Sequence, residues 1–207
     1  MSHSVSHESS VSHECSVFHE SNAACPTSPA CPTSSISRFL TEDATKTLVT
    51  SYILSRLDYC NCLLMGTPNS VIQPLQKIQN CAARLVLLAP RHHHSTPLLE
   101  KLHWLPISER IKYKVACMCF SAITGSGPAY LSELHVYTPS RTLCSSSDTC
   151  MLEIQQYKRK THGFRTFSCF GPHIWNSLPQ DIRHCSTLSS FKAKLKTFLF
   201  SQYFHPN

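Results

Sequence analysis

The pattern of hydrophobic and polar residues predicts helices along most of the chain after residue 36. Hydrophobic residues recur there at spacings of three and four, which places them on one face of an amphipathic helix. The segments with this pattern are, in order, 41–60, 69–86, 96–102, 107–123 and 186–199. We therefore expect a mainly α fold, a small helical domain of about five to six helices.

Several helix ends carry recognisable signals. Thr41 is suited to cap a helix, and Glu42 and Asp43 follow it in the first turn, where carboxylates complement the helix dipole. Asn69 is the expected cap of the next long helix. Gly125 is the expected left-handed residue that follows the helix over 107–123.

The third quarter of the chain is the least regular. Ser and Thr dominate residues 138–149, which predicts a loop, and residues 151–170 admit a short β-strand or β-hairpin. Trp104 and Trp175 each lie just before a Leu-Pro pair. We interpret both tryptophans as buried anchors at helix junctions.

Residues 1–35 are a polar, low-complexity repeat with a period of six, as in Ser4-Val5-Ser6-His7-Glu8 and Ser10-Val11-Ser12-His13-Glu14. Such a segment buries too little apolar area to offset the entropy of ordering. We expect a disordered tail over 1–35 and a helical domain over 36–207. A His/Cys metal tract is the alternative, but the ligands do not form a compact pair of pairs.

Positive charge is confined to the helical domain. Residues 1–37 contain three acids and no Lys or Arg, so residues 38–207 hold all 19 basic residues and nine of the 12 acids, a net charge of +10. A basic body favours RNA or DNA as a partner. A merely solvated basic surface is the alternative.

The chain contains 12 cysteines, but they do not indicate a secreted disulfide scaffold. The N-terminus shows no apolar signal-peptide core, and half of the cysteines fall in apolar helical patterns. No apolar run approaches the ~18 residues needed to cross a bilayer. We expect an intracellular protein, cytoplasmic or nuclear, with no membrane partner.

The acidic residues do not have the arrangement that catalysis of nucleotidyl transfer needs. That reaction uses clustered carboxylates to hold two metal ions, whereas the acids after residue 43 are isolated and no Asp-Asp pair occurs. His92-His93-His94 is better explained as a solvated loop than as a zinc site, because adjacent residues rarely point at one centre. We expect no enzyme activity, no cofactor and no metal.

The densest basic stretch, 157–165, is the best candidate surface for nucleic acid. Its cations are suited to neutralise phosphates, and Tyr157 or Phe164 to stack on an unpaired base. A charged turn with buried aromatics is an equally weighted alternative. A second candidate is the pair Lys77 and Arg84, which lie seven residues apart on the polar face of one predicted helix. The candidate binding residues are Lys77, Arg84, Lys158, Arg159, Lys160 and Arg165.

Six ordered blocks in roughly residues 36–200 resemble the C-terminal region, at or beyond the thumb, of LINE-type (non-LTR) retrotransposon reverse transcriptases. These blocks are Ser55–Asn61, Leu75–Val86, Leu102–Pro106, Arg110–Lys114, Tyr137–Arg141 and Phe170–Pro179. The resemblance implies a helical accessory region that helps to hold template RNA or the primed target. The fingers, palm and endonuclease of that family are missing here, and Cys144 and Cys150 depart from its pattern.

Two classes of function follow. The first is a non-catalytic fragment of a retrotransposon reverse transcriptase that retains RNA or other nucleic-acid binding. The alternative is a helical protein-interaction or structural module, in which apolar helix faces bind a protein partner, or a transposon relic without function. Steep dependence of RNA affinity on salt favours the first class, whereas self-association without RNA affinity favours the second.

Overall fold

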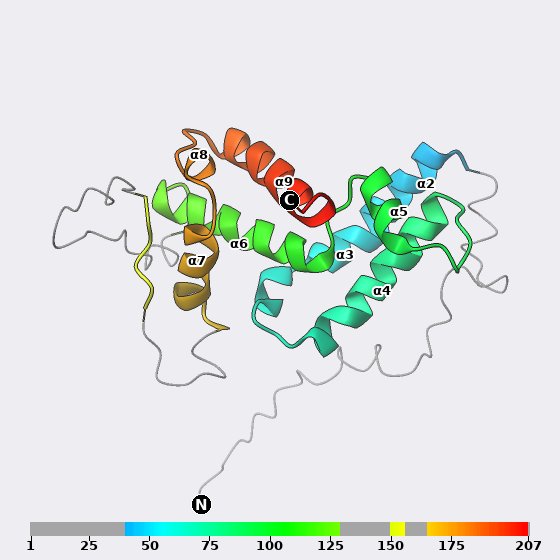
Figure 1. Cartoon of the computed structure of the whole chain (residues 1–207), viewed down its shortest axis with the longest axis horizontal. Helices are drawn as coiled ribbons and strands as arrows, with labels where there is room; N and C mark the ends of the chain where they lie inside the picture. Colours follow the sequence, from blue (N-terminus) through cyan, green and yellow to red (C-terminus); the bar gives the residue numbers. More distant parts are fainter. Residues whose placement is uncertain (1–39, 129–149, 156–164, 207) are drawn as a thin grey trace, which may run out of the picture.

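The computed structural model describes residues 40–128, 150–155 and 165–206, and within them the chain is mainly helical, as predicted. The repeat segment 1–35, expected to be disordered, lies outside the described residues. The helical elements (Figure 1) are α2 (Glu42–Val49), the π-helical segment η2 (Thr50–Leu54), α3 (Ser55–Asp58), the 3₁₀ turn η3 (Asn61–Leu64), α4 (Asn69–Val86), α5 (Ser95–Lys101), α6 (Ile107–Ile123), α7 (Phe167–Asn176), α8 (Gln180–Arg183) and α9 (Leu188–Phe204).

The first helical arm begins as predicted. Thr41 caps α2, and its Oγ1 accepts a hydrogen bond from the Ala44 N–H at 3.3 Å. The single helix expected over 41–60 is not a regular α-helix throughout. After α2 it widens into the π-helical segment η2, and it then ends with the short helix α3 at Asp58. The hydroxyls of Ser51 and Ser55 donate to carbonyls of the preceding turn. Such side-chain bonds compete with the backbone ladder and bend helices, which accounts for the irregularity.

The start of α4 differs from the prediction by one residue. Pro68, not Asn69, occupies the cap position, and Asn69 is the first helical residue. The Pro68 carbonyl already accepts the Val71 N–H at 3.0 Å, so the first turn forms before the Asn69 side chain can act as a cap. The predicted bounds of α6, 107–123, are confirmed, and Gly125 follows it with a positive φ of 67°.

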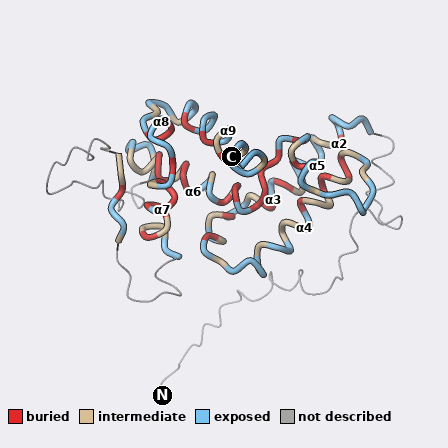
Figure 2. The backbone as a smooth tube through the Cα atoms, viewed as in Figure 1, coloured by how far each residue is buried: buried red, intermediate tan, exposed pale blue. Residues whose placement is uncertain are grey.

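Helix α6 lies in the middle of the molecule and packs against α7, α9 and α4. In Figure 1, α9 lies above α6, α7 below its left part and α4 to its right. Its buried residues continue into the inner faces of the neighbouring helices (Figure 2). Trp175 is 1 % exposed and Trp104 is 6 % exposed, so both tryptophans are core residues as predicted. Phe191 of α9 stacks on Phe120 of α6, with ring centroids 4.5 Å apart.

Helices α6 and α7 approach closely at Gly171. A Cβ atom built on Gly171 would lie 3.0 Å from Cys119 Sγ and 3.4 Å from Phe167 Cε2. No larger residue fits there without displacing one of these side chains. The absence of a side chain at Gly171 therefore allows α6 and α7 to pack this closely.

The segment for which a strand or hairpin was expected is only partly described. Residues 150–155 contain no helix, and the chain is helical again from Phe167. The Asn176 side-chain amide pairs with the Leu152 backbone, accepting its N–H and donating to its carbonyl, both at 2.9 Å. Asn176 thus supplies the hydrogen bonds that a neighbouring strand would supply, and the described residues contain no strand.

Candidate nucleic-acid interface

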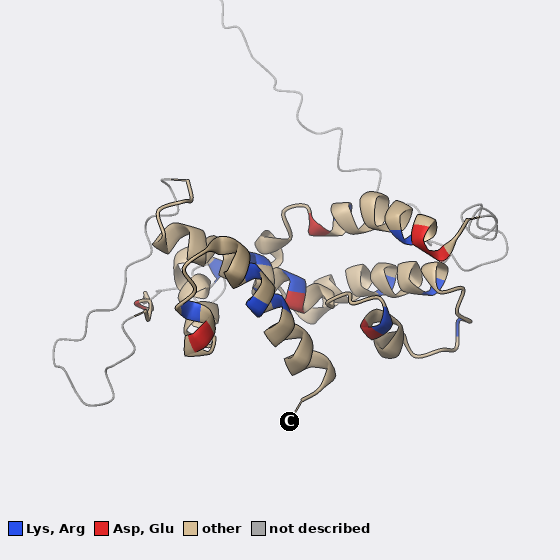
Figure 3. Cartoon of the chain, turned by 90° about the horizontal axis from the view of Figure 1, so that it is seen from above, with Lys and Arg blue, Asp and Glu red and all other residues tan. Residues whose placement is uncertain are grey.

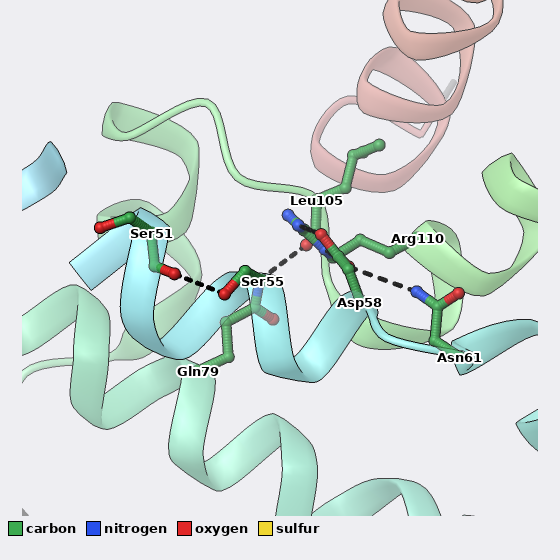
Figure 4. A network of polar contacts seen from close by, with 7 residues as sticks. All are labelled: Ser51, Ser55, Asp58, Asn61, Gln79, Leu105 and Arg110. Atoms are coloured by element: carbon green, nitrogen blue, oxygen red, sulfur yellow. Dashed lines mark hydrogen bonds and ion pairs between the residues drawn. The ribbon is translucent and has the colours of Figure 1, made fainter. Parts of the chain in front are cut away.

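Two of the sequence blocks, Ser55–Asn61 and Arg110–Lys114, meet through an ion pair. Arg110 binds both carboxylate oxygens of Asp58, its Nε donating to Oδ1 at 2.7 Å and its Nη2 to Oδ2 (Figure 4). Asn61 Nδ2 also donates to Asp58 Oδ1, at 3.3 Å. The forked guanidinium matches the planar carboxylate, so this contact fixes the end of α3 against the start of α6.

Two glutamines of α4 hold the junction between α5 and α6. Gln79 is fully buried and donates through Nε2 to the Leu105 carbonyl at 2.8 Å. Gln76 accepts the Ile107 N–H at 2.9 Å and donates to Gln79 Oε1 at 3.0 Å. These bonds satisfy backbone groups that the tight turn at Pro106 leaves without helical partners. Neither glutamine was given a role from the sequence.

A pocket of about 370 Å³ lies beside the ion pair, where four separate segments come together. Its lining includes residues of three sequence blocks, together with one lysine of α9. The lining residues are Thr50, Leu54, Asp58, Asn61, His103, Trp104, Leu105, Arg110, Tyr113, Lys114 and Lys196. Among the described lining residues, Asp58 is the only acid and is paired with Arg110, so Lys114 and Lys196 give this lining a net positive charge.

A second pocket, of about 450 Å³, shares Tyr113 and Lys114 with the first and adds Lys192 of α9. None of the described residues that line it is acidic. We call the two adjoining pockets the α6–α9 groove. Figure 3 shows Lys and Arg gathered in the middle of the molecule, where these two helices lie together. Lys192 and Lys196 are four residues apart and therefore share a face of α9.

The pKa values of two groups in the groove, Cys117 and Tyr113, are shifted by this arrangement. Burial raises the pKa of the Cys117 thiol, while Lys192 and Lys114 act in the opposite direction, so both ammonium groups lie near the thiol. Burial is also the main cause that raises the pKa of Tyr113 to about 12, with further contributions from the Cys117 charge and hydrogen bond. Tyr113 is therefore a neutral aromatic group at physiological pH.

The residues nominated from the sequence lie elsewhere or outside the described residues. Lys158, Arg159 and Lys160 fall in the segment 156–164, which the structure does not describe. Arg165 is exposed, and its Cγ would lie 3.2 Å from a Cβ built on Gly66. Arg165 does not line the α6–α9 groove.

The second nominated pair divides into an exposed and a structural residue. Lys77 is exposed on α4, whereas Arg84 is half-buried and donates through Nη2 to the His93 carbonyl at 3.1 Å. Arg84 thereby holds the loop between α4 and α5. Neither residue lines the groove.

Lys192 and Lys196 were not among the candidate binding residues nominated from the sequence. The signal that could have found the groove is the matching four-residue spacing of Arg110 and Lys114 on a helix that packs against α9. That packing is a long-range contact, and periodicity within one helix does not reveal its partner.

The triple histidine lies in an exposed loop, as interpreted, with the His92 and His93 rings edge to face at 5.2 Å. Within the described ranges, no group of three or more His, Cys, Asp and Glu side chains is placed to hold a metal ion. No described helix has the length and apolar character required to cross a membrane.

No family model, curated protein or solved structure matches this chain. The assignment of a function therefore depends on the residues of the groove and on the sequence blocks that meet beside it.

Proposed function

We propose that this chain is a non-catalytic nucleic-acid-binding fragment of a retrotransposon reverse transcriptase, and that the α6–α9 groove binds the backbone of a single strand. The observation that carries the proposal is the charge of the groove. Three exposed lysines, Lys114, Lys192 and Lys196, line it without an unpaired acid. Positively charged grooves with aromatic walls are the usual sites for single-stranded nucleic acid.

The sequence blocks support the same assignment. Asp58, Asn61, Trp104 and Arg110 belong to blocks that resemble the reverse transcriptase tail, and all four line one end of the groove. The resemblance of these blocks implies contact with template RNA or the primed target. A strand lying along α9 would place successive phosphates near Lys192 and Lys196, which are exposed and directed by the same helix.

The direct test is the salt dependence of single-stranded RNA affinity in two charge-matched variants. The groove variant carries Lys114→Gln, Lys192→Gln and Lys196→Gln, and the control carries Lys46→Gln, Arg91→Gln and Lys101→Gln. Each phosphate contact contributes about 0.7 to the log–log salt slope, so the groove variant should lose up to about 2 units. The control removes the same charge away from the groove and should keep the parental slope.

The sequence-nominated surface provides the competing result. A variant with Lys158, Arg159, Lys160 and Arg165 all changed to Gln tests the basic stretch, with circular dichroism as the folding control. If the salt slope of RNA affinity becomes smaller in this variant and stays parental in the groove variant, the strand binds the basic stretch and not the groove. A parent chain with no affinity for RNA contradicts the proposal altogether.

The second candidate function is a protein-interaction module. Tyr52, Tyr59 and Leu63 belong to the first helical arm and are 69 %, 81 % and 75 % exposed. Exposed apolar side chains of this size are typical of surfaces that bind a protein partner. Concentration-dependent sedimentation of a chain that does not bind RNA would favour this function over the first.

A further inference from the structure

The pocket of about 370 Å³ beside the Asp58–Arg110 ion pair has features that a backbone-binding groove does not need. Its volume falls in the range of about 300–1,000 Å³ found for small-molecule sites. Three rings, His103, Trp104 and Tyr113, line it together with Lys114 and Lys196. An enclosure with aromatic walls and cations at its edge fits a flat heterocycle that carries a phosphate.

His103 lines this pocket and has a strained, left-handed backbone conformation. It follows α5 with φ 57°, its N–H bonds the Glu100 carbonyl at 2.9 Å, and the Trp104 N–H bonds the Leu99 carbonyl at 2.9 Å. This is the left-handed helix end at which glycine is favoured, because a side chain is strained there. The His103 ring is exposed, stacked on Phe200 with centroids 5.4 Å apart, and lines the pocket.

The chain contains a matched position without a pocket. Leu88 follows α4 with φ 49°, and the Ala89 N–H bonds the Arg84 carbonyl at 3.0 Å, which is the same helix end. Leu88 is 65 % exposed and lines neither pocket of the groove. The third such end, after α6, has Gly125. Replacing His103 and Leu88 by glycine therefore relieves the same strain at two sites and removes a pocket ring at only one.

A second irregularity borders the same pocket. Thr50 begins the π-helical segment η2 and lines the pocket with Leu54. π-Helical turns are rare and occur frequently at functional sites. Thr50 is exposed, so a larger side chain there extends into the pocket without entering the core.

We propose that this pocket holds one unstacked nucleotide of the bound strand, with its base against His103 and the other rings and its phosphate at Lys114 and Lys196. This inference rests on the proposed function and adds a base-binding position to it. A base in a duplex is not available to such a pocket, so the chain should prefer single strands.

The test uses a single-stranded RNA decamer with one 2-aminopurine, whose fluorescence falls when the base stacks, and the same decamer with an abasic unit at that position. The variants are Thr50→Phe, which fills the pocket, His103→Gly, and the control Leu88→Gly. The parent should quench the 2-aminopurine and bind it about tenfold more tightly than the abasic strand, since stacking of one base has that order of effect.

In both pocket variants we expect the tenfold difference and the quenching to disappear while the salt slope stays parental, because the phosphate contacts remain. Leu88→Gly should behave as the parent. Circular dichroism and unfolding midpoints establish that each variant is folded. If folded Thr50→Phe and His103→Gly proteins both discriminate against the abasic strand as the parent does, the pocket proposal is overturned and the groove proposal survives. If the parent binds neither strand, the groove proposal fails first.

Discussion

Two regions, one near each end of α6, are held together by different interactions. The aromatic core consists of Phe120, Trp175 and Phe191. The Phe191 ring stacks on the other two, with its centroid 4.5 Å from that of Phe120 and 5.7 Å from that of Trp175. The polar junction consists of the Asp58–Arg110 ion pair and the Gln76–Gln79 pair with the backbone that they bind. The first region excludes water by close packing, whereas the second depends on every buried polar group finding a partner.

The difference shows where a site can form. Close-packed rings leave no room for a ligand, and the pocket of about 370 Å³ lies instead beside the Asp58–Arg110 pair of the polar junction. There the ion pair is only partly buried, with the Arg110 side chain 20 % and the Asp58 side chain 35 % exposed. The hydrogen bonds of the polar junction hold the backbone around the pocket in place, and its side chains do not fill the pocket.

The largest effect is expected in the aromatic core. Trp175→Ala removes a ring that is 1 % exposed and should lower the free energy of unfolding by about 3–5 kcal/mol. The measurement is chemical denaturation followed by circular dichroism. Trp175→Phe is the matched control, because it retains an aromatic ring and loses the Nε1 hydrogen bond to the Cys150 carbonyl at 2.6 Å. An unchanged midpoint for Trp175→Ala would contradict the close packing of this region.

Much of the fold was predictable from local patterns. The bounds of α6, the cap at Thr41 and the burial of both tryptophans followed from periodicity, capping chemistry and the large apolar area of the indole ring. These features depend on residues close together in sequence. A helix period or a cap is visible without knowledge of the partner helix.

The polar junction and the groove were not predictable in the same way. Gln76 bonds Ile107 across 31 positions and Arg110 bonds Asp58 across 52. A glutamine on the border of an apolar stripe looks the same whether it faces water or a backbone carbonyl. The groove lysines likewise became a group only when α9 was packed against α6. Charge density along the sequence instead pointed to the stretch 157–165, most of which lies outside the described residues.

A smaller loss is expected when the polar junction is broken. Gln79→Leu has nearly the same volume but leaves the Leu105 carbonyl without its partner and removes one of the two acceptors of the Gln76 amide, the other being Asn80 Oδ1. Unsatisfied buried groups cost about 1–3 kcal/mol, so unfolding should become easier by that amount. Gln73→Leu is the control, since Gln73 is exposed on the same helix and should change stability by less than about 0.5 kcal/mol. Equal stability of the two variants would mean that the hydrogen bonds of the buried Gln79 side chain contribute nothing to the free energy of unfolding.

The smallest expected effect is a pH dependence of stability that arises at Cys119, near the aromatic core, and not in the polar junction. Burial raises the pKa of the Cys119 thiol from 9.0 to about 12, and Cys119 packs against Gly171 at the closely packed end of the molecule. The unfolded chain loses this proton near pH 9, whereas the folded chain retains it up to about pH 12. The stability due to the neutral thiol is therefore complete below pH 9 and declines as the pH rises through this window, by roughly 1 kcal/mol at pH 10.

Denaturation midpoints at pH 8 and pH 10 measure this decline. Cys119→Ala removes the titrating thiol and should show a decline smaller than that of the parent by about 1 kcal/mol, whatever its stability at pH 8. Gln79→Leu changes no titrating group in the polar junction and should keep the parental pH dependence. Measurement at pH 10 leaves Tyr113, with its raised pKa of about 12, protonated in the folded chain in all three proteins. If Cys119→Ala declines as steeply as the parent, the thiol is accessible to water and the close approach of α6 and α7 at Gly171 is looser than described.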